Sequence, residues 1–154
     1  MRFRNTENST SVEPRYGTFA EKRFLKQGFT AMREIFEQNL KQVEEEVPRL
    51  EVDFTPTAAF DFSAEIFVDG KSKCRCRVWL ANHIGSDSIG FQEGNATGNS
   101  FNEILYPSTD GEPAFSASMA MGMTEVERSF GMKGLNAEDA AAYLWARFVK
   151  PLSY

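Results

Sequence analysis

Residues 60–80 have the sequence FDFSAEIFVDGKSKCRCRVWL, which alternates apolar and polar side chains on both sides of one Asp-Gly pair. A period of two is typical of a β-strand that buries one face. Two such strands joined by a short turn predict a β-hairpin with an apolar face and a charged face. The side chains expected on the apolar face are Phe60, Phe62, Ala64, Ile66, Val68, Cys74, Cys76, Val78 and Leu80.

The same pattern predicts the register of the hairpin. A regular two-residue turn at Asp69 and Gly70 would set Ile66 against Lys73 and place charges on the apolar face. We therefore expect a three-residue loop, Val68-Asp69-Gly70, with Gly70 in the left-handed bulge position. This loop sets the following residues opposite each other: Ala64 and Cys74, Phe62 and Cys76, Phe60 and Val78, Glu65 and Lys73, and Asp61 and Arg77.

A long amphipathic helix precedes the hairpin. Thr18 and Glu21 have the spacing of a capping box, in which the Thr18 side chain accepts the backbone amide of Glu21 and the Glu21 side chain accepts the backbone amide of Thr18. Pro48 ends the helix, because the residue before a proline is pushed out of the α region. Gly28 lies within the apolar stripe, where either a close backbone approach or a slight bend of the helix is expected. The stripe has spacings of three and four residues and comprises Leu25, Phe29, Met32, Phe36, Leu40, Val43 and Val47.

Further strands and a second helix follow the hairpin. Asn136 is expected to cap a final helix that runs to Lys150. A glycine- and proline-rich turn is expected at residues 107–113. Alternation between such turns places the additional strands at residues 88–93, 101–106 and 114–123.

These elements predict an α+β fold, in which a long N-terminal helix packs on a twisted antiparallel sheet of about five strands, with a C-terminal helix. The strand order is expected to be a meander, because sequential hairpins dominate. Residues 1–17 are polar and aperiodic, so we expect a flexible N-terminal arm there. Residues 18–154 are expected to form a single α+β domain.

Charge and composition restrict the possible partners. The net charge is -5 and the pI is about 5.0, whereas a domain that binds nucleic acid usually shows a basic footprint. No apolar run approaches the roughly 18 residues of a membrane helix, and residues 1–17 lack the apolar core of a signal peptide. Cys74 and Cys76 are badly oriented for a disulfide. We therefore expect a cytoplasmic protein that binds neither nucleic acid nor membrane.

One histidine limits the catalytic possibilities. With Asp87 across the following turn, or with Glu103, His83 could act as an oriented general base. A partly exposed turn histidine is the interpretation we favour, because the sequence places no nucleophile beside it. Cys74, Cys76 and His83 supply three soft ligands where zinc takes four, so we expect buried thiols, no metal and no cofactor.

Two stripes of side chains are candidates for binding. The first is basic and aromatic and comprises Lys73, Arg75, Arg77 and Trp79. It could hold a phosphate chain or single-stranded nucleic acid, but we favour neutralisation by cross-strand pairing with Glu65 and Asp61. The second stripe is apolar and is formed by Phe115, Met119, Met121 and Met123. It could line an adaptable pocket, or it could pack as core under the long helix. The residues considered for ligand binding are these four and Trp79 of the first stripe.

Together these features favour a non-catalytic binding module that uses an apolar groove or cavity for a small ligand or a protein partner. The alternatives are a small cup-shaped enzyme that uses His83 with a nearby carboxylate, and a dimeric interaction or assembly protein. We expect a homodimer, because the long helix outspans the sheet and leaves apolar residues uncovered at one end. The candidate contact residues are Val43 and Val47, or Phe24 and Leu25, with the small-residue face of the last strand as a second surface.

We predict that Thr18→Ala lowers the free energy of unfolding by about 1 kcal/mol, because a backbone amide of the first helical turn loses its acceptor. Urea unfolding of the two proteins measures the difference. An unchanged midpoint would show that the helix begins elsewhere.

Overall fold

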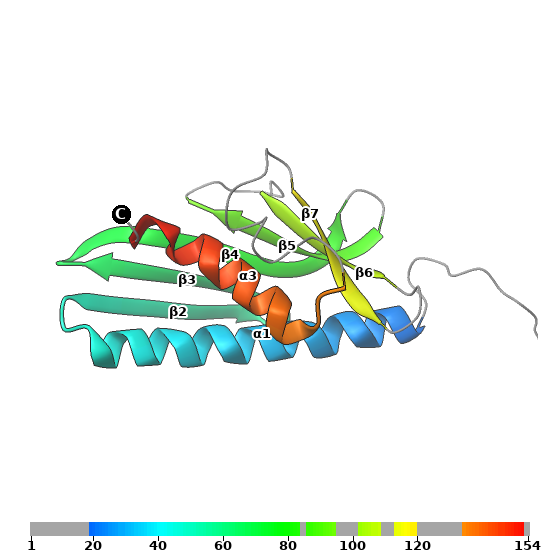
Figure 1. Cartoon of the computed structure of the whole chain (residues 1–154), viewed down its shortest axis with the longest axis horizontal. Helices are drawn as coiled ribbons and strands as arrows, with labels where there is room; N and C mark the ends of the chain where they lie inside the picture. The colour runs from blue at the N-terminus through cyan, green and yellow to red at the C-terminus, as the bar shows by residue number, and fades with distance from the viewer. Residues whose placement is uncertain (1–18, 84–85, 95–101, 109–112, 120–133, 153–154) are drawn as a thin grey trace, which may run out of the picture.

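A six-stranded antiparallel sheet and two α-helices make up the computed structural model, which describes residues 19–83, 86–94, 102–108, 113–119 and 134–152 (Figure 1). The fold is α+β as predicted, and the strands follow each other as a meander in the order β2-β3-β4-β5-β6-β7. The sheet has one strand more than the five expected. The elements are α1 (Phe19–Glu46), β2 (Leu50–Ala58), β3 (Asp61–Val68), β4 (Lys71–His83), β5 (Ser86–Glu93), β6 (Glu103–Ser108), β7 (Ala114–Met119), α3 (Ala137–Val149) and a 3-10 turn, η1 (Lys150–Leu152).

The additional strand is β2, which lies at one edge of the sheet. Leu50, Val52 and Phe54 are half-buried and alternate with exposed residues, so β2 has the period of two that defines a strand. Pro56 is tolerated in β2 because an edge strand need not donate to a neighbour on its outer side. Two further bounds differ from expectation, since Pro107 belongs to β6 rather than to a turn and β5 begins at Ser86.

The hairpin of β3 and β4 has the predicted faces but not the predicted register. Asp69 and Gly70 have φ values of 52° and 81°, so the turn is the two-residue type that places both residues in the left-handed region. A bulge between Ile66 and Phe67 then adds one residue to β4. The pairs beyond the bulge are therefore Ile66 with Cys74, Ala64 with Cys76 and Phe62 with Val78, two residues away from the predicted register.

The faces survive this shift because a displacement of two residues returns each side chain to the same side of the strand. Cys74 and Cys76 are 2% and 1% exposed, as expected for the inner face. Arg77 still pairs with Asp61, at 2.9 Å, although Arg77 lies directly opposite Ser63. Glu65, in contrast, pairs with Arg75 at 3.3 Å rather than with Lys73, so that predicted pair was wrong.

Helix α1 crosses the strands on the inner face of the sheet. Near its start, Gly28 and Phe24 meet the ring of Phe115 on β7. Phe36 contacts Phe62 on β3, with ring centroids 5.4 Å apart. The end of α1 then runs beside β2 (Figure 1). The predicted stripe is confirmed from Leu25 to Leu40, all of whose members are at most 1% exposed: Leu25, Phe29, Met32, Phe36 and Leu40.

Helix α3 shares the inner face with α1. Asn136 caps it as predicted, since its side-chain oxygen accepts the backbone amide of Asp139 at 2.7 Å. Phe148 and Trp145 pack against Phe36 of α1, with centroid distances of 6.0 and 5.4 Å. The core between the sheet and the two helices is rich in aromatic rings, and its fully buried aromatic residues are Phe29, Phe36, Phe62, Phe91, Phe115, Tyr143 and Phe148.

Some predictions fall outside the described residues: the arm at residues 1–17, the cap at Thr18, and Met121 and Met123. Within the described part of the chain, neither helix combines the length and the apolar character that crossing a membrane would need.

The close approach at Gly28 leads to a test of the packing. A methyl group there would overlap the buried ring of Phe115, whose Cε2 would lie 2.8 Å away. We predict that Gly28→Ala lowers the free energy of unfolding by about 1–3 kcal/mol, as overpacking typically does. In a Phe115→Leu background the same change should be neutral or stabilising by up to about 1 kcal/mol, because alanine favours helix over glycine. Equal losses in both backgrounds would refute the proposed contact.

Candidate functional site

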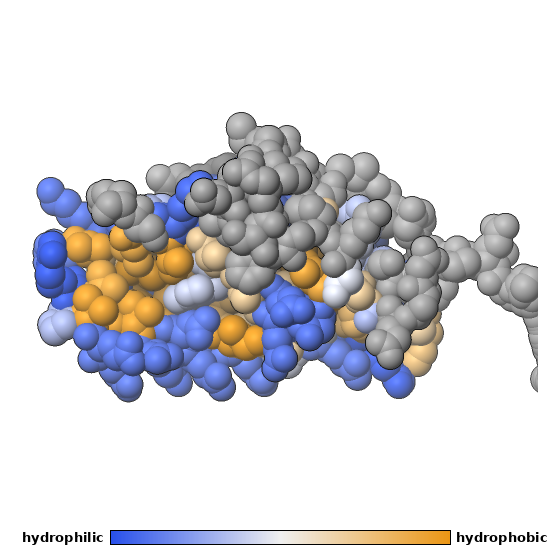
Figure 2. Space-filling model, in the orientation of Figure 1, coloured by the Kyte–Doolittle hydropathy of each residue, from blue (hydrophilic) through white to orange (hydrophobic). Residues whose placement is uncertain are grey.

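A groove opens where the C-terminal ends of both helices meet the tip of the β3–β4 hairpin. Its volume is about 720 Å³, within the range of roughly 300–1,000 Å³ that is usual for ligand sites. We call it the end groove. Figure 2 shows apolar surface gathered at this end of the molecule, above the last turns of α1. The apolar side chains that line it are Val43, Val47, Leu50, Val68, Trp145, Val149 and Leu152.

The walls of the end groove come from six elements that the fold brings together: α1, β2, β3, β4, α3 and η1. Val43 and Val47 belong to the end of α1 and its exit, and Val47 is 40% exposed. Trp145 forms the opposite wall on α3. Its indole ring is held edge-on against Phe36 and Phe148, with centroid distances of 5.4 and 5.5 Å. One wall is therefore a rigid aromatic surface, of the type that anchors binding partners.

A basic rim borders the apolar walls and consists of Arg49, Lys71 and Lys73. Arg49 also connects the loop before β2 to the turn of the β3–β4 hairpin, because its guanidinium donates hydrogen bonds to the Asp69 carboxylate. Nη2 of Arg49 and Oδ2 of Asp69 are 2.5 Å apart. This hydrogen bond lowers the pKa of Asp69. The β4 bulge explains why Lys73 lines the end groove. The predicted register had assigned Lys73 to the opposite face of the sheet. Re-aiming one side chain is a common effect of a β-bulge.

Of the residues considered for ligand binding, Phe115 and Trp79 are those whose side chains the structure describes, and they lie on opposite faces of the sheet. Phe115 is fully buried in the core beneath Phe24 and Gly28. Trp79 lies on the outer face, which is the face opposite the helices, because it follows the core residue Val78 along the strand. The backbone of Met119 pairs with Glu103 at the end of β7, and its side chain is outside the described residues.

Of the residues considered for catalysis, His83 and Asp87 have neighbouring backbones at one end of β4 and β5, and Glu103 lies farther along the sheet. The backbone of His83 pairs with Ser86 at the end of the β4–β5 hairpin, and its side chain is outside the described residues. Asp87 lines a small hollow with Lys22 and Lys26 of α1. Glu103 pairs with Phe91, four residues along β5 from Asp87, which corresponds to about 13 Å. The structure therefore does not bring Glu103 next to Asp87.

Glu103 instead belongs to a buried polar cluster that sequence reasoning did not detect. It is 0% exposed, and its carboxylate accepts hydrogen bonds from the Tyr143 hydroxyl and from Arg147. Arg147 also pairs with Glu93, at 2.8 Å. These contacts fasten α3 to β5 and β6. Removing one partner of such a buried pair typically destabilises a protein strongly, which favours a structural role.

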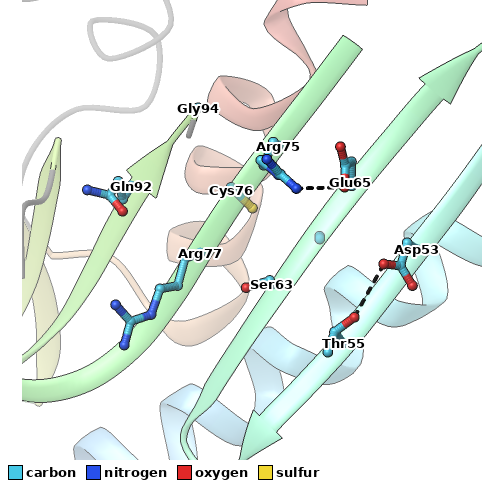
Figure 3. A pocket seen from close by; sticks show the side chains of 10 residues that line it. Asp53, Thr55, Ser63, Glu65, Arg75, Cys76, Arg77, Gln92 and Gly94 are labelled. Atoms are coloured by element: carbon cyan, nitrogen blue, oxygen red, sulfur yellow. Dashed lines mark hydrogen bonds and ion pairs between the residues drawn. The ribbon is translucent and has the colours of Figure 1, made fainter. Parts of the chain in front are cut away.

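The outer face carries a shallow polar hollow of about 350 Å³ that crosses β2 to β5 (Figure 3). Its charges are largely paired: Arg75 with Glu65 at 3.3 Å, and Arg77 with Asp61 at 2.9 Å. Arg77 also lies over the Trp79 ring, with 4.1 Å to its centroid. The predicted neutralisation of the basic stripe is thus confirmed for Arg77, whereas Glu65 pairs with Arg75 in place of the predicted Lys73.

The two thiols lie on the inner face of β4. Burial raises the pKa of Cys74 to about 11 and that of Cys76 well above its ordinary value. Among the described residues, no cluster of three His, Cys, Asp or Glu side chains has a geometry suited to a metal ion. Protonated, buried thiols behave chiefly as small apolar side chains.

The raised pKa of Cys74 implies a specific dependence of stability on pH. In the unfolded chain the thiol ionises near its ordinary pKa, whereas the folded protein keeps it protonated to about pH 11. Between these values the folded state binds more protons, so stability falls as the pH rises. We predict that the wild type loses stability between pH 9 and 11 more steeply than Cys74→Ala does, by at most about 1.4 kcal/mol per pH unit. Parallel urea-midpoint profiles would contradict this.

The comparisons with known proteins give one finding. Residues 51–150 match the Y4lF protein domain, a range that contains nearly all of the sheet and the whole of α3. Neither the comparison with curated proteins nor that with solved structures gives a match. Because the matched range covers well over half of the 154 residues, the chain belongs to the Y4lF protein domain family.

Proposed function

We propose that this protein is a non-catalytic binding module, and that the end groove takes an apolar segment of a protein partner that also carries negative charge. The observation that supports this is the combination of apolar walls with a cationic rim at one site. In the end groove, the apolar side chains of Val43, Val47, Leu50 and Trp145 lie beside the lysines of the basic rim.

The apolar walls favour a partner that buries hydrophobic side chains. Val47 is 40% exposed, and removing apolar surface from water contributes roughly 25 cal/mol per Å². Trp145 provides a large ring whose position is already set by Phe36 and Phe148. A preset aromatic surface costs little conformational entropy on binding, so it is suited to anchor a partner.

The cationic rim favours negative charge on that partner. Lys71 and Lys73 stand on the hairpin side of the groove, and Arg49 stands at the entrance to β2. Complementary charge around an apolar centre adds selectivity and speeds association more than it adds affinity. The shape supports a protein segment rather than an enclosed small molecule, because Val47 of the lining is 40% exposed and apolar surface is visible at this end of the molecule (Figure 2).

Two amphiphiles with the same chain and opposite charge probe this chemistry: dodecanoate and dodecyltrimethylammonium, both below their micelle concentrations. We predict that dodecanoate changes the fluorescence of Trp145 and binds about five to ten times more tightly than the cation, as expected for one or two ion pairs. Trp145→Phe should remove the signal, since the remaining tryptophan, Trp79, lies on the other face.

A charge-matched pair of variants locates the site. Lys71→Glu with Lys73→Glu should abolish or reverse the preference for dodecanoate. Lys22→Glu with Lys26→Glu changes the charge equally but lies near the start of α1, about 30 Å from Val43 along the helix, and should leave the preference intact. Equal binding of both amphiphiles, or equal effects of the two variants, would contradict the proposed function.

A further inference from the structure

The end of α1 is itself an acidic and apolar segment. Glu44, Glu45 and Glu46 form its last turn and directly precede Val47. The last turn of α1 contains no basic residue. Because the C-terminal end of a helix carries a partial negative charge, three carboxylates there are unfavourable unless cations lie nearby.

This acidic turn and the basic rim flank the same apolar surface. Val43 and Val47, which lie on either side of the three glutamates in the sequence, also line the end groove. Lys71 and Lys73 line it from the β3–β4 hairpin. The helix turn that contributes apolar side chains to the groove is thus acidic, and the hairpin that contributes another wall is basic, so two copies of this end of the molecule offer each other opposite charges.

We propose that the partner segment is the C-terminal end of α1 of a second copy of this chain, bound in a two-fold symmetric dimer. This inference rests on the proposed function of the end groove. In a two-fold interface the same patch is used by both copies, so each contact occurs twice. Val47 of each copy packs against the apolar walls of the other, and Glu45 and Glu46 meet the Lys71 and Lys73 side of the partner copy.

The arrangement of the glutamates within one copy fits this assignment. The Glu44 carboxylate accepts the backbone amide of Val52 at 3.1 Å, which ties it to β2. Glu46 accepts from Gln42 at 3.0 Å, within the same helix. Both contacts are with neutral donors, so they leave the negative charge of the turn to be balanced. Lysines of a second copy supply that charge and also complement the helix dipole.

Sedimentation equilibrium over a concentration series tests the assembly. We expect the wild type to form a dimer and Val47→Glu to raise its dissociation constant at least about tenfold, because a charge enters the apolar centre. Circular dichroism checks that the variant is folded. A wild type that stays monomeric at several hundred micromolar would refute the dimer, as would a dimer that Val47→Glu leaves unchanged.

Two charge-reversed variants test the pairing itself. Glu45→Lys with Glu46→Lys, and separately Lys71→Glu with Lys73→Glu, should each dissociate the homodimer, because like charges then face each other at both contacts. An equimolar mixture of the two variants should recover a dimer, since both contacts of the mixed pair again join opposite charges. Glu34→Lys with Glu37→Lys, earlier on α1, is the matched control and should leave the wild-type mass unchanged. Failure of the mixture to associate would refute the assigned pairing.

The outcomes separate this inference from the proposed function. Dodecanoate should compete with the second copy and convert the dimer to monomer. If dodecanoate binds selectively to a protein that is always monomeric, the groove keeps its proposed function and the second copy is excluded as its occupant. If the dimer forms and responds to the charge variants but dodecanoate does not bind, the dimer stands and the broader chemistry assigned to the groove fails.

Discussion

The contact between Gly28 and Phe115 sets the position of α1 and, through it, most of the molecule. The missing side chain of Gly28 lets the helix backbone reach the ring of Phe115 on β7, at the far edge of the sheet from β2. From this point α1 continues for about 28 Å to Val47 and so reaches the opposite edge. The diagonal path brings the end of α1 beside Trp145 and the β3–β4 hairpin. A bulkier residue at position 28 would displace both the core packing and the groove wall.

The bulge in β4 links the interior of the protein to its surface. One additional residue near Ser72 keeps Cys74 and Cys76 on the buried side after a tight two-residue turn. The same irregularity accompanies the presence of Lys73 at the end groove, whereas a regular strand would have kept it with Arg75 on the outer face. The contribution of Lys73 to the cationic rim thus follows from the way the hairpin satisfies its hydrophobic alternation.

The sequence predicted elements and faces well, and pairings less well. Alternation in residues 60–80 constrains only the parity of the register, so pairings that differ by two residues bury the same side chains and cannot be told apart. Strand β2 was missed although Leu50, Val52 and Phe54 alternate, because the segment is acidic and contains Pro56. For the candidate site, the exposed end of α1 could be predicted from helix length alone. Its opposite wall could not, since Trp145 lies about a hundred residues away and only the tertiary fold brings it near.

The position of α1 beside β2 also has a consequence for the fate of the protein under stress. Edge strands expose unpaired backbone groups and can template the addition of strands from other molecules. Here the Glu44 carboxylate accepts a hydrogen bond from the backbone amide of Val52, and Arg33 donates a hydrogen bond to the carbonyl of Ala59 just beyond the strand. Fraying of the last turns of α1 would uncover this edge before the core opens. The end of α1 therefore satisfies one backbone amide of the edge strand, and loss of that contact would leave the amide available to pair with a strand of another molecule.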